Sequence, residues 1–344
     1  MSPLIQLILM LTLISGTLIT LMSNHWLMAW AGLEINMLSI MPLIAKTHHP
    51  RATEATTKYF LAQAGASMLM LFSSTLNAWY TSTWDITQLT NPYSCMLLTI
   101  ALCMKAGLAP MHLWLPDTMQ GTTLNTSFII ATWQKLAPMG LIIMTTNSHS
   151  KLILLTMATM SIFIGGWGGL NQTQLRKLLA FSSIANMGWM IIIVTMTPKL
   201  TTLTLSLYIV MLATLFILMI SQKTNTIKTI SESWTTSPTM TSIMLLTLIS
   251  LGGLPPMTGF LPKWLILQEL ITNTLITIAA MAATATLLSL FFYLRLFYAT
   301  TMTISPNSTT TQQKWRQMPQ NTLTTAMLVP PTLLLLPLLP MLLP

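Results

Sequence analysis

The chain has 344 residues, of which 53% are hydrophobic and only 6% are charged. Soluble domains carry about 25% charged residues, so this composition excludes a water-soluble globular protein. The formal net charge of +9 would also fit nucleic-acid binding, but the positions of the basic residues explain it through membrane topology instead. Apolar stretches of about 20 residues, the length of a membrane-spanning helix, follow one another almost to the end. The sequence therefore predicts an all-α polytopic membrane protein.

Eleven segments are long enough to span a membrane and are separated by polar or Pro/Gly-rich breaks. In chain order they are residues 3–22, 26–45, 57–79, 93–116, 123–146, 151–170, 174–195, 200–221, 239–271, 275–300 and 322–343. The ninth is too long for one straight crossing, which predicts a broken helix. No basic residue precedes the first segment and no small-residue cleavage site follows it, so we expect no cleavable signal peptide.

The basic residues in the loops and at the ends of the spans divide unequally between the two sides of the membrane. Only Lys151 and Lys199 lie on the side of the odd-numbered loops. Nine others lie on the opposite side: Lys46, Arg51, Lys58, Arg176, Lys177, Lys223, Lys228, Lys314 and Arg316. In membrane proteins the short loops on the inner side carry the excess of Lys and Arg. We therefore expect the N-terminus inside and, with an odd number of spans, the C-terminus outside.

One helix-breaking pattern occurs twice, as "KAGLAPMHLWLPD" at 105–117 and "LGGLPPMTGFLPK" at 251–263. With an offset of 253 − 107 = 146, six of the thirteen positions are identical. Matched Gly/Pro interruptions in two hydrophobic segments are typical of inverted-repeat transporters, whose ion sites lie at such breaks. Because they fall in segments four and nine, we expect two five-helix repeats, the second inverted. The boundaries are 1–147 and 148–300, followed by a loop on the inner side of the membrane and a C-terminal helix at 301–344.

Four charged residues lie deep inside predicted spans: Glu34, Lys105, Lys135 and Lys263. A charge at the bilayer centre costs at least about 2.5–3.5 kcal/mol, so such residues are candidates for a functional site. A buried lysine can exchange a proton near neutral pH, whereas an arginine cannot. A purely structural Glu–Lys pair remains the alternative. Arg295 lies near a helix end, where snorkelling to the interface is the simpler interpretation.

The histidines do not show metal-ligand spacing. His112 lies in the first break and is a possible proton relay, although its counterpart in the repeat is Thr258. The others lie at loops or helix ends, where we expect solvated side chains: His25, His48, His49 and His149. The sequence carries no flavin, nicotinamide, haem or iron–sulfur signature, so we expect no cofactor in this chain.

Several stretches resemble a known family: "SNHWLMAWAGLEINML", "RATEATTKYFLAQAGASM", "KAGLAPMHLWLPD" and "QLRKLLAFSSIANMGWM". They are similar to the antiporter-like membrane subunits of mitochondrial NADH:ubiquinone oxidoreductase, respiratory complex I, which are related to subunits of multi-component cation/proton antiporters. The resemblance covers essentially the whole chain. It implies a core subunit of the membrane arm, in the mitochondrial inner membrane, that translocates protons while NADH reduces ubiquinone.

The resemblance also implies roles for individual residues. Glu34 and Lys105 would form a pair, Lys135 would be the central connecting lysine, and Lys263 would lie on the second broken helix. Asn186 departs from the histidine or lysine often found at its position in related subunits. FMN, iron–sulfur clusters and ubiquinone would belong to other subunits. The implied partners are those subunits, especially neighbouring antiporter-like ones, and membrane lipids, with no nucleic acid.

Three other functions stay open on the sequence. A stand-alone cation/proton antiporter would transport ions as an isolated chain. A structural spacer of the membrane arm would need no intramembrane lysines. A quinone site would need a polar pocket motif, and none is evident.

Overall fold

A computed structural model describes residues 2–302 and 322–338 of the chain. These residues form helices and, within those ranges, no β-strand beyond two isolated bridges. Eight helical spans in this part are long and apolar enough to cross a membrane, and three shorter apolar helices accompany them. The expected all-α membrane fold is confirmed. The number of eleven crossings and the inverted relation of the repeats stay predictions.

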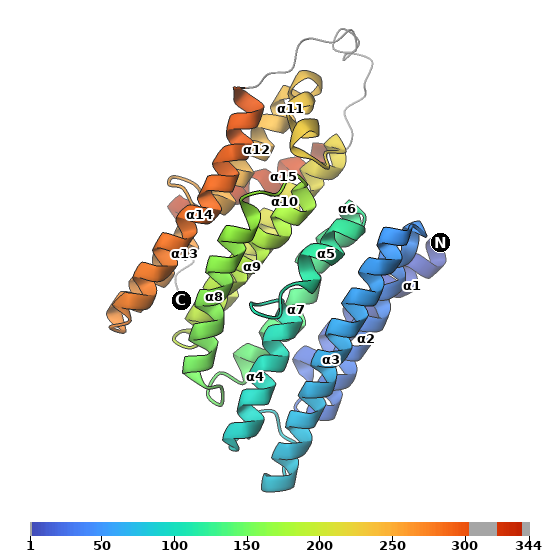
Figure 1. Ribbon diagram of the computed structural model, residues 1–344, viewed down its shortest axis with the longest axis vertical. Coiled ribbons are helices and arrows are strands. Elements are labelled where there is room, and N and C mark those ends of the chain that lie inside the picture. The colour runs from blue at the N-terminus through green and yellow to red at the C-terminus, as the bar shows by residue number, and fades with distance from the viewer. Residues whose placement is uncertain (1, 303–321, 339–344) are drawn as a thin grey trace. The chain divides into compact units, whose positions relative to one another are not determined.

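The chain folds as two compact units, Met1–Ser161 with Val194–Pro198, and Ile162–Ile193 with Lys199–Pro344. The first, unit 1, contains α1 Pro3–Met22, α2 Trp26–Ile44, a short 3-10 helix Ala45–Thr47, α3 Pro50–Thr81, α4 Pro92–Ala106, α5 Trp114–Gly121, α6 Leu124–Ala131 and α7 Trp133–Met144. In unit 1, α1 packs on α2 and α2 on α3, as the blue helices of Figure 1 show, while α4 packs against α3 and α7.

Helix α8, Lys151–Gly169, runs from unit 1 into unit 2. Unit 2 continues with α9 Leu175–Val194, α10 Pro198–Gln222, α11 Ile227–Thr236, α12 Pro238–Gly252, α13 Phe260–Thr272, α14 Ile276–Thr301 and α15 Thr322–Leu333. Helix α14 packs against α11, α12 and α13, and α15 packs on α12.

Local sequence explains where several helices begin. Proline occupies the first turn of α1, α3, α4 and α12, where its missing N–H removes no helical hydrogen bond. Side chains of the preceding residues cap three of these ends: Ser2, His49 and Asn91. Because of the His49 cap, α3 begins at Pro50, seven residues before the predicted span.

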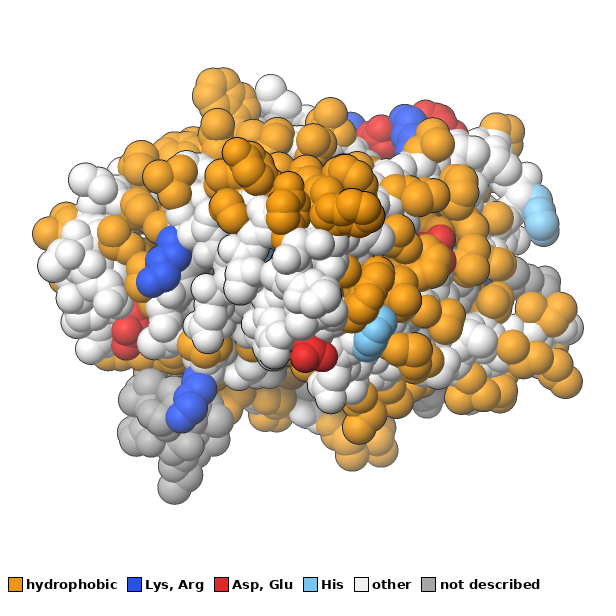
Figure 2. Space-filling model, turned by 90° about the horizontal axis from the view of Figure 1, so that it is seen from below, with side chains coloured by type: hydrophobic (Ala, Val, Ile, Leu, Met, Phe, Trp, Pro, Cys, Tyr) orange, Lys and Arg blue, Asp and Glu red, His pale blue; other side chains and the backbone are white. Residues whose placement is uncertain are grey.

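The surface is apolar, as a bilayer requires. Along α1, one face exposes Leu4, Leu7 and Leu11 at helical spacing, while the opposite face buries Leu13 and Thr20. Figure 2 shows hydrophobic side chains over much of the face in view, with few charged ones between them. Such a surface suits lipid tails or neighbouring membrane helices.

The structure corrects the sequence interpretation at the C-terminal segment. The helix expected over 322–343 ends at Leu333 and is followed by a 3-10 turn, Leu336–Leu338. Pro337 lacks the N–H that would bond to the Leu333 carbonyl and disfavours the α conformation at the residue before it, which opposes a continuation of the helix. Residues 339–344 lie outside the described part.

Candidate functional site

The first Gly/Pro pattern interrupts a helix in unit 1. Helix α4 ends at Ala106, Gly107 adopts φ 78° and ψ 37°, and α5 begins only at Trp114. The carbonyl of Met104, left open by the break, accepts bonds from the Gly107 N–H at 3.2 Å and from the Trp114 indole Nε1 at 3.1 Å. A left-handed residue at a helix end favours glycine. The break therefore follows from this sequence and its open carbonyl is satisfied by protein.

The second pattern interrupts a helix in unit 2 in the same way. Helix α12 ends at Gly252, Gly253 adopts φ 81° and ψ 37°, and α13 begins at Phe260. The peptide bonds before Pro110 and Pro256, at equivalent positions, are both cis. The two interruptions lie where the sequence predicts them.

Each break places a lysine at the end of a half-helix. Lys105 is in the last turn of α4 and is only 6% exposed. Lys263, on α13, donates from Nζ to the Gly252 carbonyl at 2.7 Å, at the C-terminus of α12. A helix C-terminus carries partial negative charge from its open carbonyls, and in transporters such half-helix ends hold cations. The second break thus supplies a hydrogen-bond partner for a charge inside an apolar segment.

Glu34, on α2, interacts electrostatically with Lys105 on α4 and with Tyr59 on α3. Among the described residues, these two charges form no ion pair within 4.0 Å. The Glu34 Oε2 atom is buried without a hydrogen-bond partner. A buried polar atom without a partner is costly, so this carboxylate has room for a further hydrogen bond or a closer cation.

A chain of neutral polar groups near this carboxylate links α3, α7 and α2. The Tyr59 hydroxyl lies 3.3 Å from Gln134 Oε1, and Gln134 Nε2 donates to the Asn36 carbonyl at 3.5 Å. Lys135 follows Gln134 in the first turn of α7 and is 4% exposed. Sequence reasoning missed Tyr59 and Gln134 because it weighed only charged side chains. Their polar groups inside apolar segments were the available signal.

Lys135 also lies beside a helix interruption. Helices α6 and α7 are separated at Thr132, which has φ −112° and ψ −68°. The Thr132 hydroxyl donates to the Phe128 carbonyl at 2.8 Å, and Pro138 leaves the carbonyl of Gln134 without its usual helical donor. The span predicted at 123–146 is therefore one crossing built from two helices.

The possible relay His112 lies in the first break and is 7% exposed, with Nδ1 3.2 Å from the Pro110 carbonyl oxygen. Its repeat counterpart, Thr258, donates its hydroxyl to the carbonyl of Thr332 on α15. Helix α15 therefore contacts the second break through this hydrogen bond. The two equivalent positions, His112 and Thr258, have different partners.

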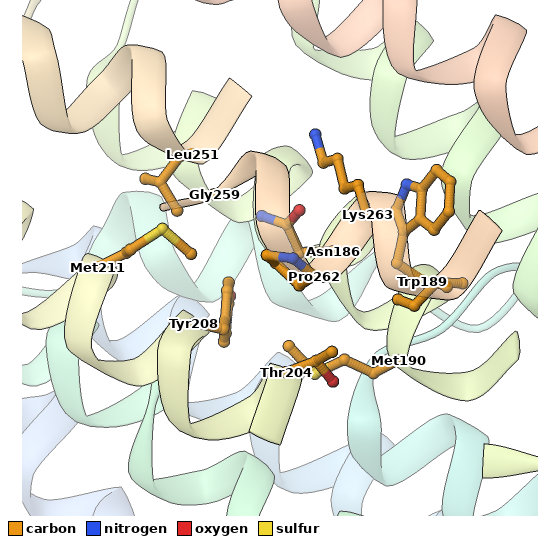
Figure 3. Close-up of a pocket in the computed structure, with 11 residues that line it drawn as sticks. Asn186, Trp189, Met190, Thr204, Tyr208, Met211, Leu251, Gly259, Pro262 and Lys263 are labelled. Carbon is orange, nitrogen blue, oxygen red and sulfur yellow. The ribbon is translucent and has the colours of Figure 1, made fainter. Parts of the chain in front are cut away.

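Unit 2 contains a cavity of about 30 Å³ next to its lysine. Figure 3 shows side chains of α9, α10 and α13 around it, with the Lys263 amine pointing away from Tyr208 and Thr204. The Trp189 Nε1 atom is buried without a hydrogen-bond partner. The cavity is lined by Asn186, Trp189, Met190, Thr204, Tyr208, Met211, Leu251, Gly259, Pro262, Lys263 and Ile266. Since a water needs about 10–15 Å³ and polar partners, this space suits one or two.

One expectation about ionisable side chains changes. His149, expected to be solvated, is 5% exposed, and its Nε2 lies 2.6 Å from the Thr145 Oγ1. The Thr145 hydroxyl donates to Leu141, so Nε2 must carry the imidazole proton. Burial lowers the pKa of His149 to about 4. Arg295 Nη1 donates to the Leu170 carbonyl at 2.7 Å, and its snorkelling to the interface stays a prediction.

Comparison with known proteins identifies the family to which this fold belongs. A family described as the transmembrane region of NADH:quinone oxidoreductase and Mrp antiporters matches residues 23–289. The chain belongs to this family. A second family, described as the NADH dehydrogenase subunit 2 C-terminus, matches residues 290–343.

Relatives in this family match over their full length. The chain is 53% identical to NADH-ubiquinone oxidoreductase chain 2 of Struthio camelus, covering 100% of this chain and 99% of the relative. It is 52% identical to the protein of the same name from Tetraodon nigroviridis, covering 99% and 98%.

Solved structures share the fold at lower identity. A chain of respiratory complex I from Thermus thermophilus matches with TM-score 0.82 and 24% identity, covering 97% of this chain and 79% of that one. A chain of an Mrp complex from a Dietzia species matches with TM-score 0.77 and 18% identity, covering 88% and 61%.

Proposed function

We propose that this chain is a proton-translocating subunit of the membrane arm of respiratory complex I, the H⁺-translocating NADH:ubiquinone oxidoreductase. The full-length similarity to proteins named chain 2 supports the assignment to this complex. The observation that carries the proton-translocating role is the placement of Lys105 in the last turn of the half-helix α4 and of the Lys263 amine at the C-terminal end of the half-helix α12. A spacer between other subunits would need neither the breaks nor the buried cations.

In this proposal Glu34, Lys105, Lys135 and Lys263 exchange protons in sequence. Moving one charge against the membrane potential requires about 2.3 kcal/mol per 100 mV. A buried Glu–Lys interaction that strengthens or weakens with distance is large enough to drive such a step. Glu34 and Lys105 interact without touching, so their attraction can change with a small movement.

The remaining parts of the machinery lie outside this chain. The redox chemistry, with FMN, iron–sulfur clusters and ubiquinone, belongs to other subunits, and this chain binds none of them. Its partners are neighbouring antiporter-like membrane subunits and lipids of the mitochondrial inner membrane. The N-terminus faces the matrix and the C-terminus faces the intermembrane space.

The orientation predicts which loops a reagent can reach. Residues 46–54 and 312–320 carry much of the basic charge and should face the matrix. The second stretch lies outside the described residues. A membrane-impermeant label applied to intact mitoplasts should leave introduced cysteines in both stretches unmodified and react after the membrane is opened. Labelling from the intermembrane side would reverse the proposed orientation.

The proposed function is tested first at Glu34. Glu34→Gln keeps the shape but removes the titratable group, so the assembled complex should pump protons about 10²-fold more slowly, a typical loss for a missing proton donor or acceptor. NADH-driven acidification of sealed vesicles measures this, with subunit content checked. Glu232→Gln, at an exposed carboxylate of α11, is the matched control. Undiminished pumping by Glu34→Gln would favour the spacer, and cation/proton exchange by the isolated chain would favour the antiporter.

A further inference from the structure

Three charged side chains meet where α3 and α5 come together in unit 1. Lys58 Nζ lies 2.7 Å from Glu54 Oε1 and 2.8 Å from Asp117 Oδ2. A cleft of about 170 Å³ adjoins them, and Arg51 and Gln120 complete its polar lining. Lys58 and Asp117 come from different helices, 59 residues apart in sequence. The ion pair therefore ties the second half of the broken segment, α5, to α3.

Asp117 occupies the repeat position of Lys263, because 117 + 146 = 263. Both residues are charged, with opposite sign, and both lie in the first turn of the half-helix that follows a break. Lys263 anchors its half-helix to the end of α12, whereas Asp117 anchors its half-helix to α3. Each unit thus holds its second half-helix through a charged side chain at the same repeat position.

The Lys58–Asp117 pair is adjacent to the buried polar chain. Tyr59 follows Lys58 on α3, and Trp114 is the first residue of α5. Their rings make an edge-to-face contact with centroids 5.6 Å apart. The Tyr59 hydroxyl reaches Gln134, and Tyr59 interacts electrostatically with Glu34. A shift of α5 along α3 would therefore move Trp114 against Tyr59 and disturb the surroundings of Glu34.

We propose that the Lys58–Asp117 ion pair is a positioning element of unit 1, which holds α5 on α3 and so fixes Trp114 and Tyr59 beside Glu34 and Lys105. This inference rests on the proposed function, because it assigns the pair a role in proton translocation. The pair acts through Trp114 and Tyr59 and transfers no proton itself.

Two simpler roles of the Lys58–Asp117 pair predict different experimental results. As a plain surface ion pair, with side chains 43% and 41% exposed, it would contribute little to stability, and its loss would change nothing measurable. As a helix-terminus charge, Asp117 would act on the α5 dipole alone, and Lys58 would not matter. Because the pair is exposed, its variants should still assemble, which keeps the test interpretable.

The test combines charge reversal with two measurements on the assembled complex. Asp117→Asn and Lys58→Gln should each lower NADH-driven proton pumping severalfold. Both should also speed hydrogen–deuterium exchange of the amides in residues 107–121. The double variant Lys58→Glu/Asp117→Lys should bring both quantities back to within about twofold of the original, since the pair reforms with reversed charges. Lys228→Ala, which removes an exposed pair on α11, should change neither.

Each departure from this pattern overturns the inference. Unchanged exchange and pumping in the single variants would reduce the pair to a surface contact. Faster exchange with normal pumping would make it an anchor without a role in translocation. Slower pumping with unchanged exchange, or no recovery in the double variant, would show that the individual charges matter instead of their contact. Normal pumping by Lys105→Ala would refute the proposed function, while the exchange data would still report on the anchor.

Discussion

Replacing Lys105 by arginine should leave the complex assembled and yet nearly abolish its proton pumping. Arginine keeps the positive charge at the end of α4, so any structural need for a cation opposite Glu34 remains satisfied. Its guanidinium, with a pKa above about 12, does not deprotonate in proteins. If Lys105 must release and regain a proton, the variant should therefore pump as poorly as Lys105→Ala.

The measurement is NADH-driven proton uptake by sealed vesicles that contain the variant complex, normalised to subunit content. Lys151→Arg, at the exposed start of α8, makes the same chemical change outside the site and should pump normally. Near-normal pumping by Lys105→Arg together with a loss in Lys105→Ala would mean that a fixed charge is sufficient. In that case Lys105 would be a structural partner of Glu34 and not a proton carrier.

The sequence predicts the two breaks well because their cause is local. Gly107 and Gly253 adopt a left-handed conformation that favours glycine, and the prolines that follow cannot continue a helix. Their repetition at a fixed offset made the pattern visible without any knowledge of packing. The buried lysines are visible for a similar reason, since a charge in an apolar segment stands out by composition alone.

Features that depend on contacts between distant segments are not visible in the same way. Tyr59 and Gln134 are ordinary polar residues in sequence, and Asp117 lies just outside the predicted span 93–116. Only the packing of α3 against α5 and of α7 near α2 gives them a role. His149 lies in a short connection that suggested solvent, yet the fold buries it against Thr145. Helix α11 was not predicted because it is short and polar. A Thr226–Thr229 capping box marks its start.

The second break offers a test in unit 2 that separates backbone strain from displacement of a lysine. A Cβ atom at Gly253 would lie 2.8 Å from Lys263 Cδ and 2.9 Å from its Nζ, closer than real side chains approach. Gly253→Ala should therefore push the amine away from the Gly252 carbonyl, at 2.7 Å in the native chain. We expect the complex to assemble and its proton pumping to fall about tenfold or more, the scale of losing a positioned proton-transfer group.

Asparagine at the same position supplies the decisive comparison. Asparagine enters the left-handed region more readily than alanine, so Gly253→Asn reduces the backbone strain while the Cβ contact with Lys263 remains. Pumping should stay low in both variants if the Lys263–Gly252 contact is what matters. Gly107→Asn is the matched control, because its Cβ would meet the flexible Leu115 Cδ1 at 2.9 Å and no ammonium group. Full recovery in Gly253→Asn would show that strain alone caused the loss, and the C-terminus of α12 would then have no part in holding the charge of Lys263.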